Sequence, residues 1–191
     1  MTRKPVAAGK SSYDLIDSEK FFTLLNLKPD TFFLDLASGA GRYSIEVAGK
    51  LKGKGSGEVH AVDLWAEGID SLNERIREQH LTNIHTFIAD ITKPLPLPDS
   101  VYDVCLLATV LHDLQMPGRG VVLQEAARVL KPGGNMAVVE FKKIDYGPGP
   151  PIHIRLSETE LEQQVTGNGF ARIACEDLSE YTYSCVFTKH S

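Results

Sequence analysis

Apolar residues recur along the chain at two spacings, one typical of strands and one typical of helices. Short apolar runs typical of buried strands occupy residues 32–36, 58–64, 84–88, 102–107 and 135–141. Residues 42–51, the segment around Leu72 and residues 122–130 instead repeat apolar positions every three or four residues, as amphipathic helices do. Strands that alternate with helices predict a mostly parallel sheet with helices on both faces.

The last part of the chain departs from this repeat. Residues 170–178 and 181–189 are both typical of strands, and only a short link around Ser179 and Glu180 joins them. A parallel return needs a long crossover, so this link forces an antiparallel pair. The pattern predicts one α/β domain over residues 1–191, with a doubly wound, mostly parallel seven-stranded sheet and a C-terminal antiparallel hairpin.

The first part of the chain predicts a helix that precedes the sheet. Residues 12–28 place apolar side chains near one helical face, and Pro29 breaks the pattern. Residues 1–11 carry basic residues without the apolar segment of a signal peptide, so we expect a flexible arm and a cytoplasmic location. A capping box of Ser157 and Glu160 predicts the start of the last helix.

Composition excludes several classes of protein. The 191 residues, 42% hydrophobic and 24% charged, suit one globular core. The longest apolar stretches fall short of the roughly 20 residues that span a bilayer, so no membrane span is predicted. A net charge of −5 disfavours a nucleic-acid partner, which needs a clustered basic face. Oligomeric state leaves no signal in the sequence.

The three cysteines predict neither a metal site nor a disulfide framework. Cys105, Cys175 and Cys185 form no CxxC pair and no cluster with neighbouring histidines, and their number is odd. They fall in predicted strands, where free cysteine is commonly buried. We therefore expect three reduced core cysteines and no metal.

A glycine-rich turn, DLASGAG, joins the first predicted strand to the following helix. Asp35 ends the strand, and Gly39 and Gly41 allow a sharp turn to which a ligand can come close. The free N–H groups of the helix that starts near Arg42 favour a negatively charged ligand group. Such a turn serves several nucleotide cofactors, so alone it does not select one.

Two more acids follow the ends of the next two strands. Asp63 ends the second strand, where a carboxylate can accept both hydroxyls of a ribose; the alternative is a helix N-cap. Asp90 ends the third strand. The carboxyl ends of parallel strands meet at one sheet edge, where ligands of open α/β folds bind. The three acids together predict a nucleoside-binding edge.

These motifs, taken in order, resemble one family. The chain resembles the class I S-adenosylmethionine-dependent methyltransferases in six motifs, which follow one another in this order. They are DLASGAG, VDL, ADI of residues 89–91, LPLPDSVYDV, LLATVLHDL and RVLKPGG. The match is closest to small members of the ubiquinone/menaquinone-biosynthesis-like (methyltransferase type 11-like) group. It covers about residues 30–141, and the C-terminal hairpin agrees with it. The resemblance implies a Rossmann-like fold and S-adenosylmethionine as cofactor.

The resemblance also implies roles for individual residues. Asp35 would line the methionine end of the cofactor, Asp63 would hold the ribose hydroxyls, and Asp90 would accept the adenine amino group. The carbonyl region at Ala108 would meet the methionine ammonium. The implied cofactor-binding residues are Asp35, Ala37, Ser38, Gly39, Gly41, Asp63, Leu64, Asp90, Ile91 and Ala108.

Ala37 departs from the family pattern, which usually has glycine there. An alanine is tolerable if its φ is negative, but it would be strained in a conformation that favours glycine. We expect cofactor binding to survive, because Gly39 and Gly41 remain. A dinucleotide is the alternative cofactor, although Ser44 stands where the dinucleotide motif has its third glycine.

Three residues are candidates for the transfer step. His112 follows the fourth strand at the sheet edge, and histidine is the usual general base near neutral pH; the alternative is that His112 only caps or packs that turn. His153 and Arg155 lie in residues 142–156, a long connection rich in glycine and proline that we expect to be an active-site loop. In that loop, His153, Arg155 and Lys143 would face an acidic or polar acceptor. The alternative is a solvated loop with ordinary surface charge.

The expected function is transfer of a methyl group to a small-molecule acceptor whose identity the sequence does not give. Two alternatives stay open at this point. One is a protein that binds S-adenosylmethionine without catalysis, and the other is an NAD-linked oxidoreductase.

Overall fold

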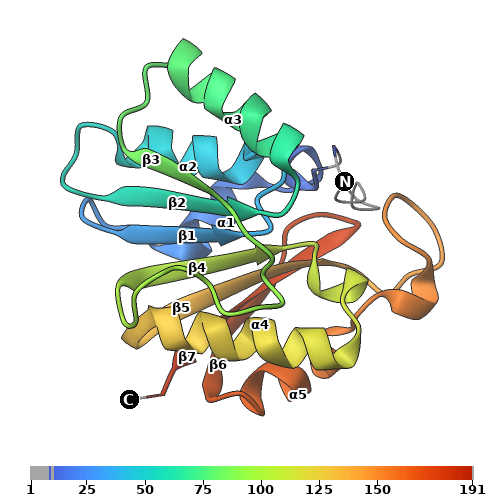
Figure 1. Ribbon diagram of the computed structural model, residues 1–191. Coiled ribbons are helices and arrows are strands. Elements are labelled where there is room, and N and C mark those ends of the chain that lie inside the picture. Colours follow the sequence, from blue (N-terminus) through green and yellow to red (C-terminus); the bar gives the residue numbers. More distant parts are fainter. Residues whose placement is uncertain (1–8, 10, 191) are drawn as a thin grey trace.

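The computed structural model describes residue 9 and residues 11–190. The predicted arm over residues 1–11 lies almost wholly outside the described residues. A single seven-stranded sheet forms the centre of the molecule (Figure 1). Its strands are β1 (Phe32–Leu36), β2 (Glu58–Asp63), β3 (Ile84–Ile88), β4 (Tyr102–Ala108), β5 (Leu130–Phe141), β6 (Phe170–Asp177) and β7 (Thr182–Lys189).

The strand order is β3-β2-β1-β4-β5-β7-β6. Strands β1 to β5 pair in parallel, and β7 runs antiparallel to both β5 and β6. The predicted mostly parallel sheet with a C-terminal antiparallel hairpin is confirmed. The strand order reverses between β1 and β4, and open α/β sheets bind ligands beyond the carboxyl ends of the strands at such a point.

Helices cover both faces of the sheet (Figure 1). The α-helices are α1 (Ser18–Leu25), α2 (Arg42–Leu51), α3 (Ala66–Glu78), α4 (Met116–Val129) and α5 (Glu158–Thr166). Side chains of α1, α2 and α3 pack in one hydrophobic core, and those of α4 and α5 pack in a second core on the other face. Strands β1, β2, β4, β5 and β7 therefore contribute side chains to both cores, whereas β6 contributes to one core only.

The predicted leading helix is in fact two elements. A 3₁₀ turn, η1 (Tyr13–Leu15), precedes α1, and Asp17 caps α1 by accepting a hydrogen bond from the Lys20 N–H. The capping box of α5 is confirmed, since Ser157 and Glu160 each accept from the other's backbone N–H.

The prediction of three reduced cysteines is wrong for two of them. Cys175 on β6 and Cys185 on β7 are directly opposite in the antiparallel register and are joined by a disulfide. Directly opposite side chains of an antiparallel pair lie close together on the same face, which is why these two meet. Cys105 is a free, buried thiol as expected.

Within the described part of the chain, no helix is long and apolar enough to cross a membrane.

Candidate active site

The turn between β1 and α2 has three residues with positive φ. Ala37, Gly39 and Gly41 have φ of 61°, 57° and 69°. A Cβ on Gly39 would have no atom within 4 Å, whereas one on Gly41 would overlap the side chain of Leu72 on α3. Gly41 is thus needed for helix packing, and Gly39 leaves open space for a ligand to approach.

Ala37 adopts the conformation that favours glycine. Its φ of 61° lies in the left-handed region, which costs an L-residue with a Cβ about 1–2 kcal/mol. The condition of a negative φ, under which alanine would be unstrained here, is not met. The backbone of the turn therefore keeps the shape that a glycine would take, at a cost in stability.

Asp35 is almost fully buried behind this turn. Its Oδ2 accepts a hydrogen bond from Ser44 Oγ on α2 at 2.5 Å. Burial raises the pKa of Asp35 to about 7; the Ser44 hydrogen bond opposes this rise and the nearby charge of Asp63 adds to it. Among the described residues no cation acts on Asp35, so a positively charged ligand group beside it would stabilise its ionised form.

Asp63 fastens the glycine turn to the end of β2. Its two carboxylate oxygens accept hydrogen bonds from the N–H groups of Gly39 and Trp65, each at 2.7 Å. The alternative of a helix N-cap is wrong, because the N-cap of α3 is Trp65. A carboxylate has about four acceptor positions, so Asp63 retains the capacity to bind ligand hydroxyls.

The end of β3 lies beside Asp63. The Ala89 N–H donates to the Asp63 carbonyl, and the next residue, Asp90, accepts from Thr92 through both its backbone N–H and its hydroxyl. These hydrogen bonds, with the charge of Lys93, hold the pKa of Asp90 below its usual value despite partial burial. Ile91 beside it is buried, and Leu64 after β2 is exposed. Asp90 is therefore ionised at neutral pH.

The end of β4 meets the N-terminal segment. Ala108 is half-buried, and Thr109 after it has a φ of 52°, a strained conformation for a β-branched residue. Ser12 Oγ lies 2.9 Å from Tyr43 Oη and 3.2 Å from Thr109 Oγ1. This buried contact was not predicted, since it joins three small polar groups far apart in sequence.

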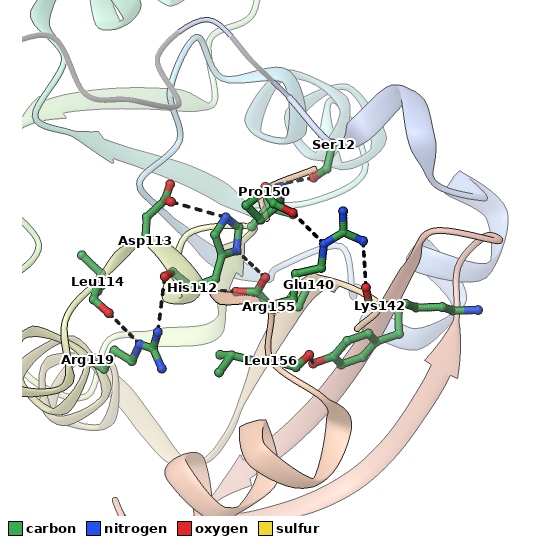
Figure 2. A network of polar contacts seen from close by, with 12 residues as sticks. Ser12, His112, Asp113, Leu114, Arg119, Glu140, Lys142, Pro150, Arg155 and Leu156 are labelled. Atoms are coloured by element: carbon green, nitrogen blue, oxygen red, sulfur yellow. Dashed lines mark hydrogen bonds and ion pairs between the residues drawn. The ribbon is translucent and has the colours of Figure 1, made fainter. Parts of the chain in front are cut away.

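His112 lies in a 3₁₀ turn, η2 (Leu111–Asp113), that follows β4. Its ring Nδ1 is 2.6 Å from Oε2 of Glu140 on β5, and the backbone N–H of His112 donates to Oε1 of the same carboxylate (Figure 2). Nε2 lies 3.6 Å from Asp113 Oδ1. Glu140 had one usable signal in the sequence, because it is a charged residue inside the apolar run of residues 136–141.

Glu140 fixes the state of the imidazole ring. An ionised carboxylate only accepts hydrogen bonds, so Nδ1 carries the hydrogen and Nε2 is left to accept a proton. Burial lowers the pKa of His112, but the hydrogen bond and charge of Glu140, with Asp113, outweigh burial and raise it. An imidazole oriented in this way is able to accept a proton from a neighbouring group.

Residues 142–156 fold against this histidine. The segment contains a 3₁₀ turn, η3 (Ile152–Ile154), and the Phe141 ring at its start lies 6.0 Å from the His112 ring. A Cβ on Gly149, at a φ of 110°, would collide with Phe141, so the loop backbone packs directly on that ring. The start of the loop thus packs beside His112, and its role in the active site stays a prediction.

Arg155 holds this loop together. Its guanidinium is buried and donates to four backbone carbonyls of the loop and its start, those of Pro150, Lys142, Ile144 and Pro148. Figure 2 shows the bonds to Pro150 and Lys142. The expectation that Arg155 faces an acceptor is corrected, because these contacts use its donors. Lys143 is likewise paired, with Glu160. His153 is exposed on η3 and stays a candidate.

Comparison with known proteins agrees with this geometry. Residues 33–134 match the family described as "Methyltransferase domain". The chain is 32% identical over 166 residues to the ubiquinone/menaquinone biosynthesis C-methyltransferase UbiE of Laribacter hongkongensis, covering 86% of this chain and 63% of that protein. It is 31% identical to a demethylmenaquinone methyltransferase of Lactobacillus johnsonii, with coverages of 86% and 63%. The chain thus spans less than two thirds of these relatives' length.

A crystal structure of a SAM-dependent methyltransferase from Aquifex aeolicus superposes with a TM-score of 0.84 at 27% identity. It covers 94% of this chain, which in turn covers 93% of it. The family match decides against the NAD-linked alternative. The chain belongs to the methyltransferase domain family, within the class I S-adenosylmethionine-dependent methyltransferases.

Proposed function

We propose that the protein transfers a methyl group from S-adenosylmethionine to a small-molecule acceptor that must also lose a proton. One observation carries this proposal: His112, oriented by buried Glu140, follows β4 beside the switch point of the sheet. Asp35 lies one residue before the end of β1, and Asp63 ends the neighbouring strand β2.

The turn and the acids fit this cofactor. Gly39 leaves open space beside the turn, so backbone groups there are accessible to a ligand. Asp35 is a buried acid without a cation among the described residues, which suits an ammonium group. When bound, S-adenosylmethionine supplies an electrophilic methyl group on a positively charged sulfur.

Each acid has a separate task in the proposal. Asp63 accepts hydrogen bonds from ribose hydroxyls while its bonds to Gly39 and Trp65 keep the turn in place. Asp90 accepts from the adenine amino group, with Leu64 and Ile91 on either side as apolar contacts. Asp35 and the Ala108 carbonyl receive the ammonium. Ala37 and Ser38 complete the turn.

His112 removes the acceptor proton in this proposal. With its Nδ1 hydrogen donated to Glu140, Nε2 accepts the proton, and the imidazolium that forms lies between Glu140 and Asp113. Phenol oxygens and ring carbons of phenols are acceptors of this kind. The relatives named for menaquinone and ubiquinone biosynthesis support a quinol-type ring as the first acceptor class to test.

The experiment measures cofactor binding and turnover separately. Calorimetry gives the affinity for S-adenosylmethionine, and mass spectrometry follows S-adenosylhomocysteine formed with quinols, phenols and amines as acceptors. We expect binding by the unaltered protein and turnover with a phenolic acceptor, weaker binding by Asp63→Asn, and lost turnover with intact binding in His112→Gln. Binding without turnover on every acceptor would instead support a non-catalytic cofactor-binding protein.

A further inference from the structure

Three potential metal ligands meet on strands β2 and β3, away from the candidate active site. Glu58 and His60 are two residues apart on β2, and His85 is the direct neighbour of His60 on β3. Residues two apart on a strand face the same side of the sheet. All three side chains therefore project from one face, close to the amino-terminal end of β2.

The ligand atoms of this cluster converge. His60 Nε2 and His85 Nε2 lie 3.6 Å and 3.9 Å from the same oxygen, Glu58 Oε2. One ligand atom from each residue lies within 4.8 Å of the others. Zinc bonds of about 2.0–2.2 Å at tetrahedral angles place ligands about 3.4 Å apart. The distances from Glu58 to the two histidines exceed this value by a few tenths of an ångström, and rotations of Glu58 and His85, which are both partly exposed, would close them.

A buried hydroxyl orients His60. Its Nδ1 lies 2.6 Å from the Oη of Tyr102, a fully buried residue of β4. A phenol both donates and accepts, so it satisfies Nδ1 in the tautomer that leaves Nε2 free. Metal-binding histidines typically make such a bond with their second ring nitrogen, which fixes the ring.

No cation of the described chain competes for the carboxylate. The ion pairs that Glu58 makes within residue 9 and residues 11–190 are only those with His60 and His85. A carboxylate and two imidazoles together form a typical ligand set for zinc. A second group, Glu158 with Cys175 and Cys185, is less suitable because its cysteines are joined in a disulfide.

We propose that Glu58, His60 and His85 bind a divalent transition-metal ion such as Zn²⁺, with water in the fourth position. The site is separate from methyl transfer, since Asp63 lies three residues beyond His60, about 10 Å along β2. Strand β3 is the sheet edge and pairs only with β2. A metal ion bound by residues of both strands would stabilise the pairing of β3 with β2.

Metal titration tests the proposal directly. The protein of residues 1–191, stripped with EDTA, is titrated with Zn²⁺ by calorimetry, and Co²⁺ is added separately to record its visible absorption. We expect one Zn²⁺ per chain and the absorption of four-coordinate Co²⁺. Glu58→Gln and His85→Gln should each weaken Zn²⁺ binding about tenfold or more, because even loss of an outer-shell partner costs 10- to 100-fold.

The matched control is His190→Gln, an exposed histidine near the end of β7. It should bind Zn²⁺ like the unaltered protein. Equal affinity in all variants would overturn the proposal. Imidazole NMR signals of the unaltered protein give a second measurement that needs no variant. Zn²⁺ should shift those of His60 and His85, and shifts confined to other histidines would also overturn it.

Discussion

Nδ1 of His112 lies 2.6 Å from Oε2 of Glu140, and both side chains are buried. The two residues are 28 positions apart, on the turn after β4 and on β5. A buried carboxylate with this single imidazole partner fixes the ring's tautomer and its direction.

The first prediction concerns the base itself. His112→Gln keeps a side chain of similar length but removes the proton acceptor, so kcat should fall by about 10²–10⁴-fold. Affinity for S-adenosylmethionine should stay within about twofold of the unaltered protein, since the cofactor acids remain. Steady-state kinetics and calorimetry measure the two quantities. His190→Gln is the control, and a kcat equal to that of this control would exclude His112 as the base.

The second prediction is a pH profile. Glu140 and Asp113 raise the pKa of His112 against the effect of burial, so kcat/KM should rise with pH to a midpoint above the ordinary value of about 6.5. Glu140→Gln removes the nearby charge and should move this midpoint to lower pH. Profiles with the same midpoint in both proteins would contradict the pairing.

The same shift also affects folding. A histidine whose pKa is raised in the folded state stabilises the fold fully below its unfolded pKa of about 6.5. This contribution is lost as pH rises through the folded pKa. The unfolding free energies of the unaltered protein and of Glu140→Gln should therefore differ most at acidic pH.

The third prediction concerns Ala37. Its φ of 61° costs about 1–2 kcal/mol, of which the added flexibility of glycine in the unfolded chain offsets about 0.4–1 kcal/mol. Ala37→Gly should raise the midpoint of thermal unfolding by up to about 4 °C and preserve cofactor binding. Ala40→Gly, in the same turn but without positive φ, should lower the midpoint. A lower midpoint for both variants would argue against strain at Ala37.

Local patterns predicted the sheet and the edge at which the site lies, because alternation and connection length constrain topology strongly. They did not predict what each polar side chain contacts. Arg155 was expected to face an acceptor, yet its fork of donors binds loop carbonyls that no sequence pattern marks. The Cys175–Cys185 pair had a signal, since both residues are equally far from residue 180 at the centre of the hairpin link.

The fourth prediction concerns Asp35, whose pKa is raised to about 7 mainly by burial. The folded state holds a proton that the unfolded chain releases near pH 4, so this group's stabilisation is lost as pH rises from about 4 to about 7. Asp35→Asn mimics the protonated acid and should flatten this part of the stability curve. It should also weaken cofactor binding at pH 8 about tenfold, since an ammonium loses its charged partner. Unfolding free energies are measured by urea unfolding from pH 4 to 7. If Asp35→Asn shows the same dependence of this free energy on pH as the unaltered protein, the burial argument is contradicted.

The fifth prediction separates holding the loop from binding the acceptor. Arg155→Lys keeps the charge but loses the fork that reaches four carbonyls, so stability should fall by about 2 kcal/mol. Amide hydrogen exchange over residues 144–150 should accelerate more than exchange in β5. Arg172→Lys, at an exposed ion pair with Glu162, is the matched control and should change neither quantity.

Kinetics decides between the two roles of Arg155. Because the loop packs on Phe141 beside His112, a loosened loop should lower kcat in Arg155→Lys while the fraction of correctly folded protein stays high. A residue that bound the acceptor would raise KM and leave loop exchange unchanged. Faster amide exchange in the loop with an unaltered KM therefore assigns Arg155 to positioning the loop. A raised KM with unaltered exchange would instead place Arg155 in the acceptor site.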